Sequence, residues 1–190
     1  MSSLLNHQNS LNLLNQFVEM SIASDNLAVA EMIIGLAIKE AEFFGQTNQK
    51  YVNCLEQQAS ILFRAKKYES STEVYAQCLK HNIFLYGERS INTILLKCKL
   101  ADAYDKVGHH ANAKKLFQEA QAFFKSDETS YKTYLDLVNL RLMEIQKIQE
   151  EVRVSPKFYS DQPLEFKKQS MASVQQRRNY SLPQTELIRD

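Results

Sequence analysis

The feature that most constrains the fold is a set of small and aromatic residues that recurs at fixed spacing. Gly108, followed by two histidines, interrupts a run of helical periodicity, which predicts a turn between two helices. Small side chains allow two helices to approach closely, and the rings of Tyr104 and Phe117 are expected to fill the space between them. Counted from Ala101, the marked residues fall at offsets of 3, 9, 12, 16 and 19, namely Tyr104, His110, Ala113, Phe117 and Ala120.

The same offsets recur twice upstream, from starting points 41 and 42 residues apart. The middle set matches well, and the first set matches only in its second helix. Stacked helical hairpins of this kind resemble tetratricopeptide repeats, whose usual period is about 34 residues, so each unit should carry a longer second helix or loop. From Ala59 the offsets reach Leu62, Tyr68, Ser71, Tyr75 and Cys78, and from Val18 they reach Ser21, Leu27, Ala30, Ile34 and Ala37.

The prediction is therefore an all-α, tetratricopeptide-like α-hairpin superhelix of about three hairpins and a capping helix, spanning residues 10–150. The expected helices are residues 10–23, 27–44, 50–65, 68–85, 90–106, 111–125 and 130 to about 150. The first helix should bury a stripe containing Leu11, Leu14, Phe17, Val18 and Ile22, and the last should bury Tyr134, Leu137, Val138, Leu142 and Ile145. The expected repeat core comprises Ala59, Tyr68, Tyr75, Ala101, Tyr104, Ala113, Phe117 and Ala120.

Residues 151–190 differ in composition from the rest of the chain. All three prolines lie there, among serine, glutamine and charged residues with little periodicity. Such a segment buries too little apolar surface to offset the entropy of ordering, which predicts a disordered tail. Its short apolar spots at 158–159, 164–166 and 187–188 suit docking on a partner, and an inert tail or the remnant of a shortened domain is the alternative.

Composition excludes several functional classes. The net charge of +1 provides no global attraction to nucleic acid or acidic lipid. No apolar run approaches the length of a membrane span, and no signal peptide is apparent, so neither a membrane nor a nucleic acid is an expected partner. Three scattered cysteines indicate reduced thiols and a cytoplasmic or nuclear protein.

The sequence offers no recognisable catalytic, cofactor or metal site. It contains neither a glycine-rich phosphate loop nor a nucleophile elbow. His109 and His110 fall in the predicted turn without further ligands at helical spacing, which favours solvated side chains over a metal site. Asp102 and Asp105 are expected to be surface charges rather than an acid–base pair. We therefore expect no enzyme, no small-molecule substrate and no cofactor.

Two surfaces are candidates for binding other proteins. The first helix of each hairpin should line a concave groove of mixed charge, suited to an extended peptide, to the chain's own tail or to a second copy. The nearly all-apolar helix at 27–44 suggests either self-association or simple burial between hairpins. The groove candidates are Asn53, Glu56, Ser60, Arg64, Leu95, Cys98, Asp102 and Lys106, and the self-association candidates are Met32, Ile33, Leu36 and Phe43.

Residues 10–140 resemble the N-terminal region of subunit 7 of the anaphase-promoting complex. The resemblance rests on residues 49–51, on ASILFRAKKY at 59–68 with Tyr75 and Leu79, on KCKLADAY at 97–104, and on the aliphatic segment 32–38. It implies a non-catalytic, homodimeric subunit of a cell-cycle ubiquitin ligase, although that family forms a much longer superhelix. The 41–42-residue period with Tyr86-Gly87-Glu88 between hairpins is also similar to kinesin light chain repeats, which implies a cargo-binding adaptor instead.

Overall fold

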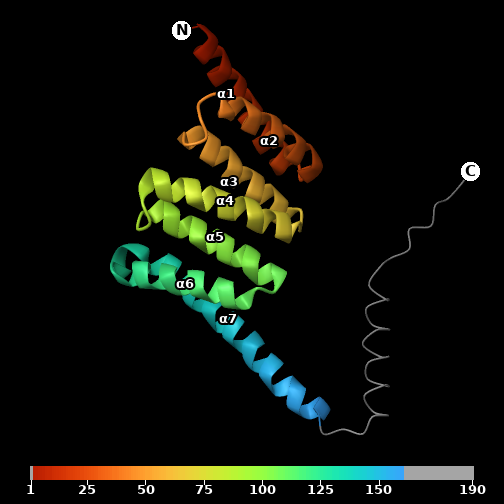
Figure 1. Cartoon of the computed structure of the whole chain (residues 1–190), viewed down its shortest axis with the longest axis vertical. Coiled ribbons are helices and arrows are strands. Elements are labelled where there is room, and N and C mark those ends of the chain that lie inside the picture. Colours follow the sequence, from red (N-terminus) through yellow and green to blue (C-terminus); the bar gives the residue numbers. More distant parts are fainter. Residues whose placement is uncertain (1, 161–190) are drawn as a thin grey trace, which may run out of the picture. The chain divides into compact units, whose positions relative to one another are not determined.

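The computed structural model describes residues 2–160, and these form seven α-helices without a strand, which confirms the all-α prediction. Two compact units are present, Met1–Ile145 and Gln146–Asp190, and the helical repeats belong to the first. The helices, labelled in Figure 1, are α1 (Ser2–Ala23), α2 (Leu27–Glu42), α3 (Gln49–Arg64), α4 (Tyr68–Tyr86), α5 (Ile91–Val107), α6 (His110–Lys125) and α7 (Glu128–Ser160).

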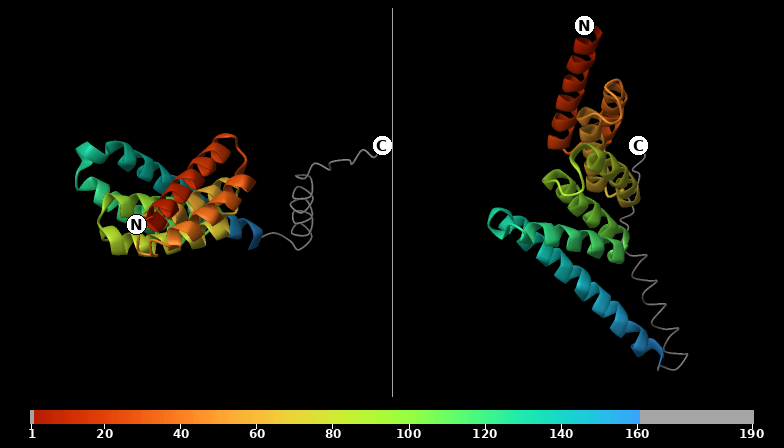
Figure 2. Two further views of the ribbon diagram at one scale, coloured as in Figure 1. Left: turned by 90° about the horizontal axis from the view of Figure 1, so that it is seen from above. Right: turned by 60° about the vertical axis from the view of Figure 1, so that its left-hand side comes forward.

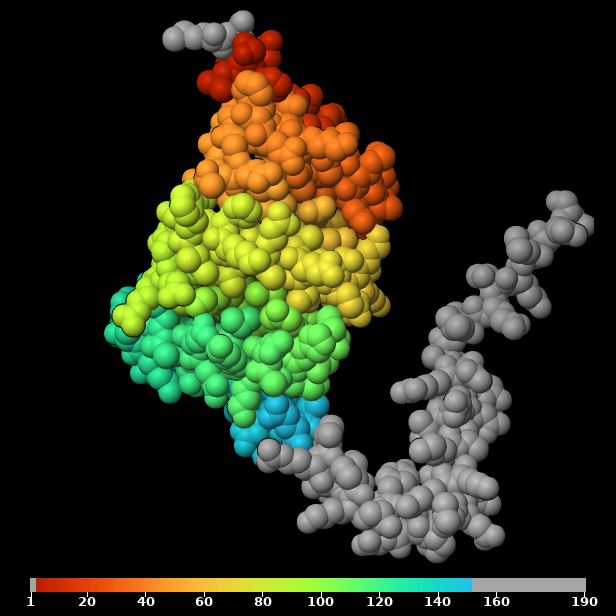
Figure 3. All heavy atoms as spheres, in the orientation of Figure 1, coloured from red at the N-terminus to blue at the C-terminus, as the bar shows by residue number. Residues whose placement is uncertain are grey.

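Consecutive helices from α1 to α6 pack against each other, so that α1–α2, α3–α4 and α5–α6 form three stacked hairpins. The turned views in Figure 2 show the same order of helices from α1 to α6. In the space-filling view the colours of these hairpins follow one another in bands, because each hairpin contacts mainly its neighbours in sequence (Figure 3). This arrangement is a tetratricopeptide-like helical repeat.

The core lies at the positions that the spacing predicts. The residues at offsets 0, 12, 16 and 19 are at most 4 % exposed in all three hairpins, including the first, where the sequence match was partial. Tyr68 and Tyr104 are only partly buried, although Tyr104 packs against both apolar clusters of the core. The twelve buried positions are Val18, Ala30, Ile34, Ala37, Ala59, Ser71, Tyr75, Cys78, Ala101, Ala113, Phe117 and Ala120.

The turn inside each hairpin also repeats. A residue with positive φ stands seven positions after each repeat start: Asp25 at 55°, Lys66 at 60° and Gly108 at 89°. Glycine adopts this left-handed conformation without strain and aspartate tolerates it, whereas lysine adopts it at a cost. The three hairpins therefore share one backbone turn, although the sequence marks it with glycine only once.

Side-chain caps define the starts of three helices. Asn26 accepts a hydrogen bond from the backbone N–H of Val29 at the start of α2, at 3.3 Å. Asn48 accepts one from Lys50 at the start of α3, and Ser90 accepts one from Thr93 at the start of α5. Each oxygen satisfies one of the four backbone donors that a helix leaves unpaired at its N-terminus, which explains why these helices begin where they do.

Both ends of the described segment are more helical than expected. The first helix begins at Ser2 rather than residue 10, and α7 continues to Ser160 rather than ending near 150. Residues 145–153 consist largely of Gln, Glu, Lys, Arg and Ile, which propagate a helix readily, so no stop signal separates them from α7. Helix α7 thus extends into residues 151–160, which the sequence places in the predicted tail, and residues 161–190 lie outside the described residues.

Several expected inner-face residues lie at the surface instead. Phe17 on α1 and Tyr134 and Leu137 on α7 are exposed, because the buried stripes are narrower than the apolar patterns in the sequence. Helix α2 buries only one face, through Ala30, Ile34, Ala37 and Ala41. Among the described residues α2 packs against both α1 and α3, whereas Met32 and Leu36 on its remaining face stay exposed.

Candidate protein-binding pocket

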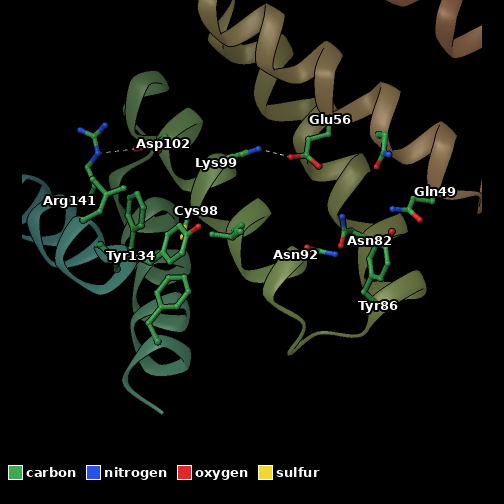
Figure 4. Close-up of a pocket in the computed structure, with 16 residues that line it drawn as sticks. Gln49, Glu56, Asn82, Tyr86, Asn92, Cys98, Lys99, Asp102, Tyr134 and Arg141 are labelled. Carbon is green, nitrogen blue, oxygen red and sulfur yellow. Dashed lines mark hydrogen bonds and ion pairs between the residues drawn. The ribbon is translucent and has the colours of Figure 1, made fainter. Parts of the chain in front are cut away.

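A pocket of about 530 Å³ lies on the side of the repeats formed by α3, α5 and α7. The close-up in Figure 4 shows side chains from these helices converging on it, with Tyr86 and Asn82 entering from α4. Its lining combines aromatic and aliphatic surface with amides and two pairs of opposite charges. The lining residues are Gln49, Asn53, Glu56, Asn82, Tyr86, Asn92, Leu95, Cys98, Lys99, Asp102, Phe117, Phe124, Tyr134, Leu137, Val138 and Arg141.

The structure brings five of the eight predicted groove residues into this pocket. These are Asn53, Glu56, Leu95, Cys98 and Asp102. The other three do not line it. Arg64 lies at the C-terminal end of α3, where its guanidinium is 3.5 Å from the Asp25 carboxylate, and Lys106 is exposed near the end of α5. Ser60 is partly buried on α3, one turn beyond Glu56.

The charged groups of the pocket pair with one another across successive helices. Lys99 Nζ on α5 lies 2.6 Å from Glu56 Oε1 on α3, and Arg141 Nε on α7 lies 3.1 Å from Asp102 Oδ1 on α5. Both pairs are drawn as dashed lines in Figure 4. The pocket therefore contains two cations and two anions that balance, and it presents no net charge to a ligand.

Two titratable groups of the pocket are affected by burial. Burial raises the pKa of the Asp102 carboxyl above its ordinary value, and the nearby Arg141 guanidinium opposes only part of that effect. Burial also raises the pKa of the Cys98 thiol to about 12. A thiol with such a pKa is protonated at neutral pH and is a poor nucleophile, which is the opposite of what a catalytic cysteine requires.

The other end of the pocket carries unpaired amides. Within residues 2–160, the side-chain amides of Gln49, Asn53 and Asn92 form no hydrogen bond to another protein group. An amide side chain offers both donors and an acceptor, which match the N–H and C=O groups of an extended backbone. Leu95, Tyr134 and Leu137 line the same pocket and provide apolar contact surface.

Comparison with known proteins identifies the repeat. The tetratricopeptide-repeat profile matches residues 51–126, which correspond to α3–α6. Residues 51–126 are therefore similar to tetratricopeptide repeats. Among solved structures, the crystal structure of BtubC (BKLC) from P. vanneervenii is similar, with a TM-score of 0.68 and 15 % identity over 95 % of this chain and 68 % of that chain. At that identity the likeness establishes the fold alone. No curated protein sequence matches significantly.

Several residues that line the pocket were not predicted from the sequence. Asn82 and Tyr86 come from the second helix of a hairpin, whereas the predicted groove is lined by first helices. Tyr134, Leu137 and Arg141 come from α7, which the sequence predicts to be a capping helix rather than the first helix of a further unit. The spacing of 134, 137 and 141 on one helical face was a signal that could have identified them.

A second apolar surface lies on the first hairpin. Met32, Leu36 and Phe43 of the predicted self-association set are 65 %, 50 % and 51 % exposed. Ile33, the fourth member, does not belong to this surface because it is partly buried against the core. Leu13, Phe17 and Met20 of α1 are also exposed and share one helical face, although the sequence predicted Phe17 to be buried.

Of the two turn histidines, His109 is exposed, as the sequence predicts, whereas His110 is partly buried. His110 Nδ1 lies 2.8 Å from Asp105 Oδ1, so His110 bridges the turn between α5 and α6. Among the described residues no group of three His, Cys, Asp or Glu side chains is arranged to hold a metal ion. Within the same part of the chain, every helix is too short or too polar to cross a membrane.

Proposed function

We propose that this chain is a non-catalytic scaffold that binds a segment of another protein in the α3–α5–α7 pocket. Tetratricopeptide repeats generally mediate protein–protein interactions, and folds of this kind are typically non-catalytic. The observation that carries the proposal is the pocket lining, which combines apolar side chains with the unpaired amides of Gln49, Asn53 and Asn92. Such a surface suits an extended peptide, whose backbone has hydrogen-bond donors and acceptors to satisfy and whose side chains can be apolar.

The charge balance of the pocket limits the kind of peptide. Lys99 and Arg141 are already engaged by Glu56 and Asp102, so binding a strongly acidic peptide would require breaking these pairs. We infer a ligand of low net charge that carries one or more large apolar side chains. Its affinity should depend only weakly on salt, because screening acts on net charge–charge interactions.

Selection of displayed random 12-residue peptides against the full chain tests this function. The selected peptides should compete with one another and should lose affinity about tenfold or more for the variant Asn53→Ala/Asn92→Ala, because each truncation removes hydrogen bonds to the bound backbone. The matched control Gln16→Ala/Gln118→Ala alters two exposed amides outside the pocket and should change affinity less than twofold. Selected peptides that bind both variants equally would contradict the assignment.

A finer proposal follows from the resemblance to subunit 7 of the anaphase-promoting complex. In it, the chain is a ubiquitin-ligase subunit in the nucleus or cytoplasm and pairs with a second copy through its first hairpin. The exposed apolar side chains Met32, Leu36 and Phe43 support such pairing, since exposed apolar clusters of this kind commonly mark interaction surfaces.

Light scattering after size-exclusion chromatography tests the pairing. At tens of micromolar the chain should elute as a dimer, and Met32→Glu/Leu36→Glu should make it monomeric because a buried unpaired carboxylate opposes association. Leu140→Glu, which changes an equally exposed leucine on α7, is the control and should leave the dimer intact. A monomeric parent chain would exclude self-association without affecting the pocket.

The alternative is an adaptor of the kinesin light chain kind that binds peptide motifs of cargo proteins. It is favoured by the 41–42-residue period of the repeats and uses the same pocket. Affinity purification from cells followed by mass spectrometry separates the two proposals. Subunits of the ubiquitin ligase support the first, motor heavy chains support the second, and their joint absence would exclude both while leaving the scaffold function to the peptide test.

A further inference from the structure

A second groove lies between α4 and α6, on the other side of α5 from the pocket described above. Its cavity is about 410 Å³, and its floor is formed by Leu100 and Tyr104 of α5. At 100° per residue these two side chains leave α5 on the side opposite Cys98 and Asp102, so the groove and the pocket are separate. The walls are Ala76, Leu79, Lys80 and Ile83 of α4 and Asn112, Lys115, Leu116 and Glu119 of α6.

The two walls of the groove have a shape against which an additional helix can pack. Each consists of residues three or four positions apart over two helical turns, so two parallel ridges enclose an apolar channel. Leu79, Ile83 and Leu116 within it remain partly accessible to solvent. Ridges of this spacing accept the side chains of an additional helix in the same way that the helices of the repeat accept each other.

The rim of the groove carries uncompensated positive charge. Three charged side chains line it, Lys80, Lys115 and Glu119. The Glu119 carboxylate is engaged by Lys97 Nζ at 2.8 Å, and Lys97 is itself largely buried. Throughout residues 2–160, neither Lys80 nor Lys115 forms an ion pair. One lysine therefore stands on each wall without a partner, in contrast to the balanced charges of the α3–α5–α7 pocket.

We propose that the α4–α6 groove docks an amphipathic helix of a partner protein whose aliphatic stripe is bordered by carboxylates. The aliphatic side chains occupy the channel above Leu100 and Tyr104. The carboxylates on the two borders of the stripe pair with Lys80 and Lys115, which fixes the orientation and the register of the helix. The chain thereby holds two different ligands at once, an extended segment in the pocket and a helix in this groove.

The test uses the full chain and a synthetic 16-residue helical peptide with leucines at positions i, i+3 and i+7 and glutamates on both borders. Binding is followed by fluorescence anisotropy and by amide chemical shifts of the isotope-labelled protein. We expect saturable binding with shifts concentrated at residues 76–83 and 112–119. Affinity should fall about tenfold between 50 and 500 mM salt, because the Debye length shortens over this range and exposed ion pairs are screened.

Charge-reversed variants provide the matched comparison. Lys80→Glu/Lys115→Glu should weaken the glutamate-bordered peptide at least tenfold and should bind a lysine-bordered version of the peptide in its place. Lys125→Glu/Lys132→Glu reverses two exposed lysines outside the groove and should change neither affinity more than twofold. The reciprocal exchange of preference cannot result from a loss of folding.

Three outcomes would overturn the proposal. They are the absence of saturable binding up to about 1 mM peptide, equal effects of the two double variants, and chemical shifts that map to the α3–α5–α7 pocket instead of the groove. None of them affects the peptide selection on Asn53 and Asn92, so the two sites can fail separately.

Discussion

The Arg141 guanidinium on α7 lies 3.1 Å from the Asp102 carboxylate on α5, yet the pKa of Asp102 is raised because burial of the carboxyl outweighs the favourable charge. The pair joins α7 to the preceding hairpin across the candidate pocket. Ionised Asp102 is thus stabilised less in the folded chain than in the unfolded chain, and this difference has a measurable pH dependence.

The first prediction concerns stability between pH 4 and pH 7. A carboxyl whose pKa is higher in the folded state binds more protons there than in the unfolded state, so its contribution to stability falls as pH rises through this range. The free energy of unfolding of the parent chain minus that of Asp102→Asn should therefore be lower at pH 7 than at pH 4. Urea unfolding of both chains at several pH values measures the difference.

Arg141→Met should make this decline steeper, because it removes the cation that opposes the effect of burial on Asp102. Lys132→Met, an exposed lysine on the same helix, is the control and should leave the slope unchanged. A difference between parent chain and Asp102→Asn that rises with pH would contradict the assignment, since it would mean that Arg141 outweighs the burial.

A second prediction concerns the three cysteines. Burial raises the pKa to about 11 for Cys54 and to about 12 for Cys78 and Cys98, and the thiolate is the reactive form. A thiol of pKa 12 is ionised about a thousandfold less at pH 8 than an ordinary thiol of pKa about 8.5. A disulfide reagent at pH 8 should therefore label Cys98 about a thousandfold more slowly in the native chain than in the chain unfolded by denaturant.

Mass spectrometry of digested protein assigns the labelled sites, and Cys98→Ser identifies the contribution of the pocket. An exposed engineered cysteine such as Gln118→Cys should react at the ordinary rate in the same sample. Rapid labelling of Cys98 in the native chain would show that the pocket opens to solvent far more than its burial indicates.

A third prediction concerns the shared turn of the hairpins. Lys66 occupies the position that glycine takes in the third hairpin, with a φ of 60° against 89° for Gly108. A left-handed residue other than glycine costs about 1–2 kcal/mol, so Lys66→Gly should raise the free energy of unfolding by up to about 1 kcal/mol after the entropy of glycine is included. Urea unfolding measures this directly.

Lys66→Ala is the matched control, because it removes the charge but keeps a side chain at the strained position. It should change stability little, whereas Gly108→Ala should destabilise by about 1–2 kcal/mol. Equal stabilisation by Lys66→Gly and Lys66→Ala would show that the charge, and not the backbone, is responsible.

The sequence predicts those features of the structure that depend on spacing within one helix, and not those that depend on how separate helices pack. The small residues Ala59 and Ala113 and the rings of Tyr75 and Phe117 are buried, since local helical spacing determines which face they occupy. The exposure of Phe17 and Leu137 was not predictable from the same pattern. Whether an apolar stripe is covered depends on a neighbouring helix, which the stripe itself does not specify.

The candidate pocket was predictable in part for the same reason. Leu95 and Asp102 follow from the periodicity of their own helix, whereas the approach of Arg141 to Asp102 joins residues 39 positions apart and depends on how α7 packs. The amides of Asn82 and Asn92 carry no periodic signal at all. Only the fold identifies them as neighbours of Asn53.

The last prediction concerns the small buried residues that allow the helices of the repeat to approach closely. Ala113 is fully buried within the core, and leucine would replace its methyl group by a larger isobutyl side chain. Overpacking of a close-packed core costs about 1–3 kcal/mol, so Ala113→Leu should lower the free energy of unfolding by that amount. Ala111→Leu places the same side chain at an exposed position two residues earlier and should change stability by less than about 0.5 kcal/mol. Urea unfolding of the two variants decides the matter: similar stabilities would mean that the helices do not approach closely at Ala113 and that the recurring alanines have no role in packing the hairpins.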